Sequence, residues 1–103
     1  IKLLIQDAML LQKSGAFAIV LECIKTPIAK KITQNLDIPT IGIGSSVYCD
    51  GQVLVTDDLL GINETKIKFV KKFLNLKKYI NLGLRKFASE VRSKKYPSKK
   101  YSY

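Results

Sequence analysis

The sequence predicts an α/β fold built on parallel strands, and two observations support this prediction. Two short runs rich in β-branched and other apolar residues, Ala16–Leu21 and Thr40–Gly44, have the composition of buried strands. A segment with helical spacing precedes each run, and the connections are very short. Parallel strands need such crossovers, so the order helix, strand, helix, strand is typical of a parallel sheet packed against helices.

The first helix is predicted over residues 1–13, where Leu4, Ala8 and Leu11 recur at helical spacing. Ser14 and Gly15 end this pattern. Glycine tolerates the left-handed conformation that closes many helices, so Gly15 is expected to be the C-terminal cap.

The first strand ends at a carboxylate, Glu22, which Cys23 follows. The composition of Ala16–Leu21 predicts a strand that is buried on both faces. Carboxylates are seldom fully buried without a partner, so a glutamate here needs a reason. Two interpretations carry equal weight at this point: Glu22 is a site residue at the strand end, or it marks where the chain meets water.

The second helix is expected to begin at Thr26-Pro27, with the threonine hydroxyl as cap and proline at the first helical position. It should end before Pro39, because the residue preceding a proline is pushed out of helical space. Its apolar stripe contains Ile28, Ala29, Ile32 and Leu36. The strand Thr40–Gly44 follows. Two strands cannot form a stable sheet, so the chain is expected to be part of a larger parallel sheet or barrel.

Residues 45–63 form a long connection with a turn signal at Asp50-Gly51 and a short extended run at Val53–Val55. Connections of this length are often functional. Residues 64–94 are predicted to be helical, and 95–103 form a basic, aromatic tail with the character of a frayed terminus. The first helical stripe contains Ile67, Val70, Phe73 and Leu74, and the second contains Leu76, Tyr79, Ile80, Leu84, Phe87, Ala88 and Val91.

The net charge of +10 is distributed unevenly along the chain. Residues 1–58 contain five lysines and six acidic residues, whereas residues 59–103 contain thirteen basic residues against Glu64 and Glu90. Only Arg85 and Arg92 are arginines, the residue usually recruited for bidentate phosphate contacts. A solvated, lysine-rich face is therefore favoured over specific nucleic-acid binding. The alternative function is a small basic module that binds acidic surfaces or nucleic acid.

Cysteine and histidine content limits the possible chemistry. There is no histidine, and Cys23 and Cys49 form no paired motif, so a structural zinc site and a histidine base are both disfavoured. Both thiols are expected to be free and buried or half-buried. No apolar run reaches the length of a membrane span and no signal peptide is recognisable, so the expected location is the cytoplasm.

The ends of the two strands are where chemistry is expected. Active sites of α/β sheets and barrels form beyond the carboxyl ends of their strands, and these strands deliver Glu22 and Gly44-Ser45-Ser46 to one edge. A carboxylate among apolar walls loses hydration and holds a proton more readily, which suits a general base near neutral pH. Gly42 and Gly44 allow a ligand close to the backbone, although this spacing is not the dinucleotide-binding fingerprint.

These motifs together resemble the ketopantoate hydroxymethyltransferase family. The similarity rests on Ile19–Cys23, Ala29–Thr33, Ile38–Gly44, Asp50–Val55 through Asp58, and Gly61-Ile62, and it continues through the late helix and Tyr96-Pro97. It covers essentially all 103 residues. A Leu-Glu-Cys strand end followed by Ile-Gly-Ile-Gly and Asp-Gly-Gln, in this order and spacing, is hard to obtain by chance.

The resemblance implies a (β/α)₈ barrel that transfers a hydroxymethyl group from methylenetetrahydrofolate to 3-methyl-2-oxobutanoate, giving 2-dehydropantoate on the pathway to pantothenate. It implies that Glu22 is the proton acceptor and that Mg²⁺ stabilises the enolate as a Lewis acid. Gly44, Ser45 and Ser46 are the candidate substrate-binding residues. The family's metal ligands lie in earlier strands, so no residue of this chain is expected to bind the metal. A homo-oligomer of decamer type is also implied.

By the same resemblance, the chain is the carboxyl-terminal part of the enzyme, a single incomplete domain that should be inactive alone. Residues 1–63 would supply the last two βα units and the active-site loop, 64–94 the terminal helices and 95–103 the tail. Two positions depart from the family. Lys25 replaces a proline beside the base, and Ser46 replaces a glycine, which would carry strain if the backbone there needs a positive φ.

Overall fold

The computed structural model describes residues 2–103 and divides them into two compact units. The first unit, called the sheet unit here, comprises the chain up to Val55 together with Lys66–Val70. The second, the helical unit, comprises Thr56–Thr65 and Lys71–Tyr103. Each unit is described by itself.

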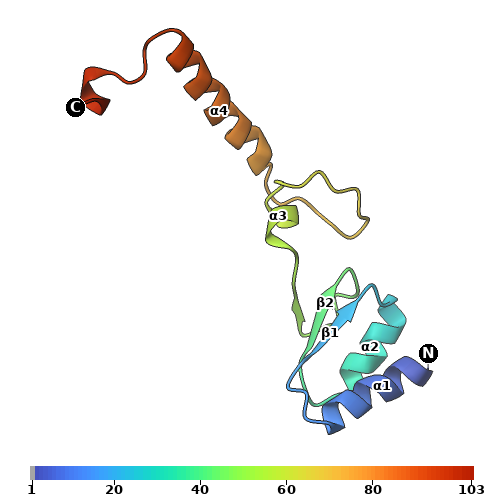
Figure 1. Ribbon diagram of the computed structural model, residues 1–103. Helices are drawn as coiled ribbons and strands as arrows, with labels where there is room; N and C mark the ends of the chain where they lie inside the picture. Colours follow the sequence, from blue (N-terminus) through green and yellow to red (C-terminus); the bar gives the residue numbers. More distant parts are fainter. Residues whose placement is uncertain (1) are drawn as a thin grey trace. The chain divides into compact units, whose positions relative to one another are not determined.

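The sheet unit is an α/β structure with a small parallel sheet (Figure 1). Its elements in chain order are α1 (Lys2–Lys13), β1 (Ile19–Glu22), α2 (Thr26–Asn35), β2 (Thr40–Ile43) and β3 (Gly51–Gln52). The strands lie in the order β1-β2-β3, and both pairs are parallel. The predicted helix and strand order of the first half is therefore confirmed. The connection after β2 also contains a strand, but it is Gly51–Gln52, at the predicted turn, rather than the extended run predicted at Val53–Val55.

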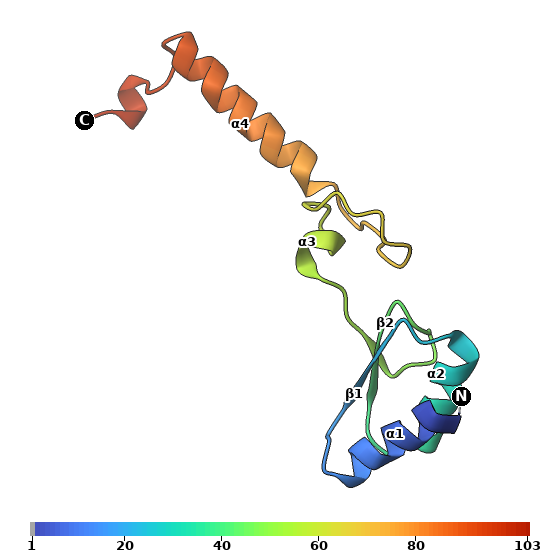
Figure 2. The ribbon, with the colours of Figure 1, turned by 45° about the vertical axis from the view of Figure 1, so that its right-hand side comes forward.

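One face of the sheet carries the core of this unit. Ile19 and Leu21 of β1 are buried against Ala8 of α1 and against Ala29 and Ile32 of α2. Both views of the ribbon show α1 and α2 side by side on this face (Figures 1 and 2). These residues form one hydrophobic cluster between the two helices and the sheet.

The other face of the sheet is not covered by any described element. Side chains alternate along a strand, so Val20 and Glu22 point away from the helices, and Val20 is 60% exposed. Ile41 and Ile43 of β2 share this face by register and are half-buried. The prediction that the first strand is buried on both faces is therefore wrong for this chain, because only one helical layer packs against it.

The element ends show which local signals decided the structure. Gly15 has φ +101°, and Ala16 N–H donates to the Leu11 carbonyl at 3.1 Å, so the predicted glycine cap of α1 is confirmed. The predicted threonine cap of α2 is wrong. Thr26 is already helical, and Lys25 holds the N-cap position without a side-chain hydrogen bond. The strand begins at Ile19 rather than Ala16, and the exposed Phe17 lies before it.

A polar cluster holds the amino end of β2 against the following loop. The Asp50 carboxylate accepts hydrogen bonds from the Thr40 backbone N–H at 2.8 Å and from the Thr40 hydroxyl at 3.2 Å. The Thr40 hydroxyl also lies 2.8 Å from that of Thr33 on α2. Thr40 is fully buried, so these bonds satisfy polar groups that would otherwise be costly. Asp50 therefore has a structural role rather than a place in the site.

The helical unit contains α3 (Thr56–Leu59), α4 (Leu76–Arg92) and the 3₁₀ turn η1 (Lys99–Tyr101). The second predicted stripe, in α4, is confirmed as helical. The prediction of a helix over the first stripe, which includes Phe73, is wrong: residues 60–75 consist of turns, bends and irregular backbone. The short helix α3 lies within the segment predicted to be a loop. Phe73 N–H donates to the Leu59 carbonyl, and Leu76 N–H donates to the Leu60 carbonyl. These long-range bonds replace the local ones that a helix would need.

The carboxyl end of α4 is capped by a lysine in the left-handed conformation, which glycine usually adopts at this position. Lys94 has φ +60°, and its N–H donates to the Val91 carbonyl while Lys95 N–H donates to the Glu90 carbonyl. This is the Schellman pattern, with lysine where glycine is usual. The tail is not simply frayed, because the Tyr96 ring packs edge-on against Phe87 at 5.6 Å. Within residues 2–103 no helix is both long enough and apolar enough to cross a bilayer.

Candidate active site

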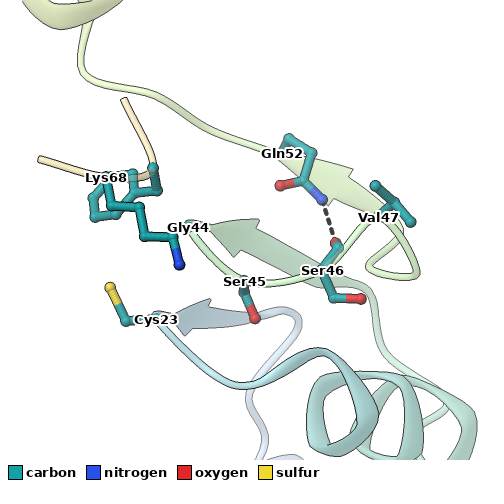
Figure 3. A pocket seen from close by; sticks show the side chains of 8 residues that line it. Cys23, Gly44, Ser45, Ser46, Val47, Gln52 and Lys68 are labelled. Carbon is teal, nitrogen blue, oxygen red and sulfur yellow. Dashed lines mark hydrogen bonds between the residues drawn. The ribbon is translucent and has the colours of Figure 1, made fainter. Parts of the chain in front are cut away.

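A cavity of about 620 Å³ lies beyond the carboxyl ends of the three strands (Figure 3). Cys23 follows β1, Gly44 follows β2, and Gln52 is the last residue of β3. All of its lining residues belong to the sheet unit, namely Cys23, Gly44, Ser45, Ser46, Val47, Gln52, Lys68 and Phe69. This is the edge where α/β folds bind their ligands.

The backbone at the end of β2 is shaped by a glycine. Gly44 has φ +59°, and a Cβ at this position would lie 2.5 Å from two atoms of the Phe69 ring. The absence of a side chain therefore lets Phe69 pack directly on the strand end. The sequence predicts that Gly44 lets a ligand approach the backbone closely. In this structure the Phe69 ring of the same unit makes that close approach.

The two serines line the cavity and shape the loop after β2. Ser45 Oγ donates to the Ile24 carbonyl at 2.9 Å, which joins the ends of β2 and β1. Ser46 is buried, its hydroxyl accepts from Tyr48 N–H, and its carbonyl accepts from Gln52 Nε2 at 2.7 Å (Figure 3). Ser46 is not among the described residues with positive φ, so the conditional strain at this departure from the family is absent.

Glu22 is the last residue of β1, and its side chain is exposed. It pairs with Ile43 across the ladder and precedes Cys23, whose N–H donates to the Ile43 carbonyl at 3.0 Å. Cys23 has φ +54°, so the chain turns sharply directly after the glutamate. Glu22 does not line the 620 Å³ cavity. It lines a separate hollow of about 270 Å³ whose other walls are mostly apolar, with Val20 of β1 and Leu4 and Leu11 of α1 among them. The structure thus places Glu22 at the same edge as the three cavity candidates but on the uncovered face.

The thiols differ in exposure. Cys49 is buried in the core, as expected, whereas Cys23 is exposed at the cavity, which the prediction of buried or half-buried thiols missed. Lys25, the other departure from the family, is exposed at the start of α2.

Two cavity residues escaped sequence reasoning. Lys68 and Phe69 lie in the segment that helical spacing assigned to a solvated helix, 24 or more residues beyond the strand that they approach. Only the tertiary structure brings them to Gly44. Among residues 2–103 no cluster of three or more His, Cys, Asp or Glu side chains is arranged to hold a metal ion.

Comparison with known proteins identifies the relationship directly. The family model described as ketopantoate hydroxymethyltransferase matches residues 1–99. A 3-methyl-2-oxobutanoate hydroxymethyltransferase of Pelagibacter ubique is 52% identical over 99% of this chain and 40% of its own length. Enzymes of the same name from Clostridium botulinum and Carboxydothermus hydrogenoformans are 46% and 48% identical over 99% and 97% of the chain.

The chain spans about 40% of the length of the curated relatives that it matches. The match nevertheless covers all three strands, the cavity and the late helix α4. With a family model along almost the whole sequence and relatives that are about half identical, this chain belongs to the ketopantoate hydroxymethyltransferase family.

Proposed function

We propose that this chain is the carboxyl-terminal part of a (β/α)₈ barrel that transfers a hydroxymethyl group from methylenetetrahydrofolate to 3-methyl-2-oxobutanoate, giving 2-dehydropantoate. The observation that carries the proposal is the cavity beyond the carboxyl ends of three parallel strands, with Glu22 at the same edge. A location in the cytoplasm and assembly into a homo-oligomer of decamer type belong to the same proposal.

The uncovered face of the sheet supports the barrel. In a barrel, one face of each strand packs on the outer helices and the other points into the barrel. Here Ile19 and Leu21 pack on helices, whereas Val20, Ile41 and Ile43 form a second apolar face. Among the described strands β1 pairs only with β2, so its outer edge offers free backbone groups to a preceding strand.

The proposed role of Glu22 is to remove the proton from the carbon next to the ketone of 3-methyl-2-oxobutanoate. Glu22 follows Val20 by two residues and shares its face of β1, and an inward-pointing side chain at the end of a barrel strand is a common position for a catalytic group, which supports this role. The remaining strands of the barrel would complete the apolar walls around Glu22, exclude water and make the carboxylate a better base.

Mg²⁺ acts in the proposed reaction as a Lewis acid when bound. The described residues do not fit it, because they contain no cluster of three metal-ligating side chains. We therefore assign no ligand in this chain and place the metal site in the remainder of the barrel.

A hybrid protein tests this proposal, called the hybrid below. It replaces the matching 102-residue segment of the Pelagibacter ubique relative with this chain. We expect the hybrid to form 2-dehydropantoate from 3-methyl-2-oxobutanoate and methylenetetrahydrofolate with Mg²⁺, and the isolated chain to be inactive. The relative carrying a scrambled segment is the negative control. A folded hybrid without activity contradicts the proposal, and robust turnover by the isolated chain contradicts the need for the remaining strands.

A further inference from the structure

The backbone of Lys68 is held at the mouth of the cavity by its neighbour in sequence, and its side chain is exposed. Lys68 and Phe69 occupy a turn in which Val70 N–H donates to the Ile67 carbonyl at 3.0 Å. The Phe69 ring packs on Gly44 at the end of β2. Because this contact anchors the turn to the strand end, the adjacent exposed lysine lies beside the cavity.

Lys68 is the single charged residue among those that line the cavity. Figure 3 shows its ammonium group directed toward the space between Cys23 and Ser45. The other lining groups are hydroxyls, an amide, a thiol and apolar side chains. Among residues 2–103, Lys68 has no ion-pair or hydrogen-bonding partner. An ammonium group without a protein partner, in a cavity that also offers neutral hydrogen-bonding groups, is suited to bind an anion.

We infer that Lys68 is a positioning residue that binds a carboxylate group of a substrate in this cavity. The inference rests on the proposed function, in which both reactants carry carboxylates: the keto acid, and the glutamate portion of the folate donor. The cavity of about 620 Å³ is large enough to hold either group with part of its molecule.

Three variants of the hybrid test the role. Lys68→Gln removes the charge, Lys68→Arg retains it, and Lys66→Gln removes an equal charge from an exposed residue of the same segment that does not line the cavity. We expect Lys68→Gln to raise the KM of one reactant by about 10- to 100-fold, the range for a lost charge-assisted hydrogen bond, with a smaller effect on kcat. Lys68→Arg should recover most of the loss, and Lys66→Gln should behave as the parent hybrid.

The reactant whose KM rises identifies the carboxylate. If the donor responds, a tetrahydropteroate donor that lacks the glutamate should bind the parent and Lys68→Gln equally well. If the keto acid responds, the donor KM should stay constant. Unchanged KM values for both reactants in an active Lys68→Gln hybrid overturn the inference and leave the proposed function intact.

Calorimetric titration tests the role of Lys68 by binding alone, without any need for turnover. The parent hybrid and Lys68→Gln are titrated with 3-methyl-2-oxobutanoate alone and with tetrahydrofolate alone. Weaker binding of one compound by the variant supports the role of Lys68 even if the hybrid does not turn over, in which case only the proposed function fails. Equal affinities, or no binding of either compound by the parent, overturn the inference.

Discussion

The contact between Gly44 and Phe69 leads to a prediction about stability that the structure makes quantitative. Gly44→Ala places a side chain at φ +59° and a Cβ 2.5 Å from the Phe69 ring. The left-handed backbone costs a non-glycine residue about 1–2 kcal/mol, and overpacking costs about 1–3 kcal/mol more. We therefore expect the free energy of unfolding of the chain to fall by about 2–5 kcal/mol, measured by urea denaturation followed by far-UV circular dichroism.

Two further variants separate the backbone cost of Gly44→Ala from its steric cost. Gly15→Ala also introduces a side chain at positive φ, but nothing lies within 4 Å of its Cβ, so only the backbone cost of about 1–2 kcal/mol should remain. In a Phe69→Ala background, Gly44→Ala should lose its clash with the ring, although the Cβ of residue 69 stays at 2.9 Å, and the two changes should show a coupling of about 1–3 kcal/mol. An equal cost of Gly44→Ala with and without the Phe69 ring refutes the contact, and with it the anchoring of Lys68.

Three further predictions concern the helical unit. Gly61→Ala should destabilise it by about 2–5 kcal/mol in thermal denaturation, because φ is +72° and the new Cβ would clash with the Leu74 carbonyl oxygen; a neutral effect would rule out this packing. Lys94→Gly should stabilise α4 by about 1 kcal/mol, since lysine occupies a left-handed cap at φ +60°, and a lower melting temperature would contradict this. The Lys77 ammonium donates a 2.7 Å hydrogen bond to Glu64 and lowers the pKa of that carboxyl below its ordinary value of 4.5. The exposed pair therefore stabilises the unit slightly above that pH and loses its effect as the pH falls through the folded-state pKa. Lys77→Gln should remove this small dependence of the melting temperature on pH, and an unchanged dependence in the variant would show that the pair does not contribute.

Local signals were sufficient where one element packs on the next in sequence. Helical spacing, a glycine cap and two β-branched runs predicted α1, β1, α2 and β2, because these elements form a single helical layer on a sheet. They also predicted that Gly44, Ser45 and Ser46 lie together at the strand ends, where the structure places them around one cavity.

The failures occur where distant segments compete with local preference. Residues 67–74 have helical spacing, yet Phe69 packs on Gly44 and the Phe73 N–H bonds to the Leu59 carbonyl, so the segment is irregular with a turn rather than helical. Lys68 was consequently assigned to a solvated helix. The exposure of Val20 has a different cause. The composition of the first strand fits a strand with two covered faces, but the described elements cover only one of them.

Proton removal by Glu22 is tested most directly by deuterium exchange without the folate donor. The hybrid, incubated with 3-methyl-2-oxobutanoate and Mg²⁺ in heavy water, should incorporate deuterium at the carbon next to the ketone, as followed by proton NMR. Glu22→Gln should slow this exchange by about 100-fold or more, the lower range for the loss of a general base, while Glu64→Gln, a matched change at an exposed glutamate, should leave it unchanged. Exchange by Glu22→Gln at the parent rate would contradict the assignment of Glu22 as the base.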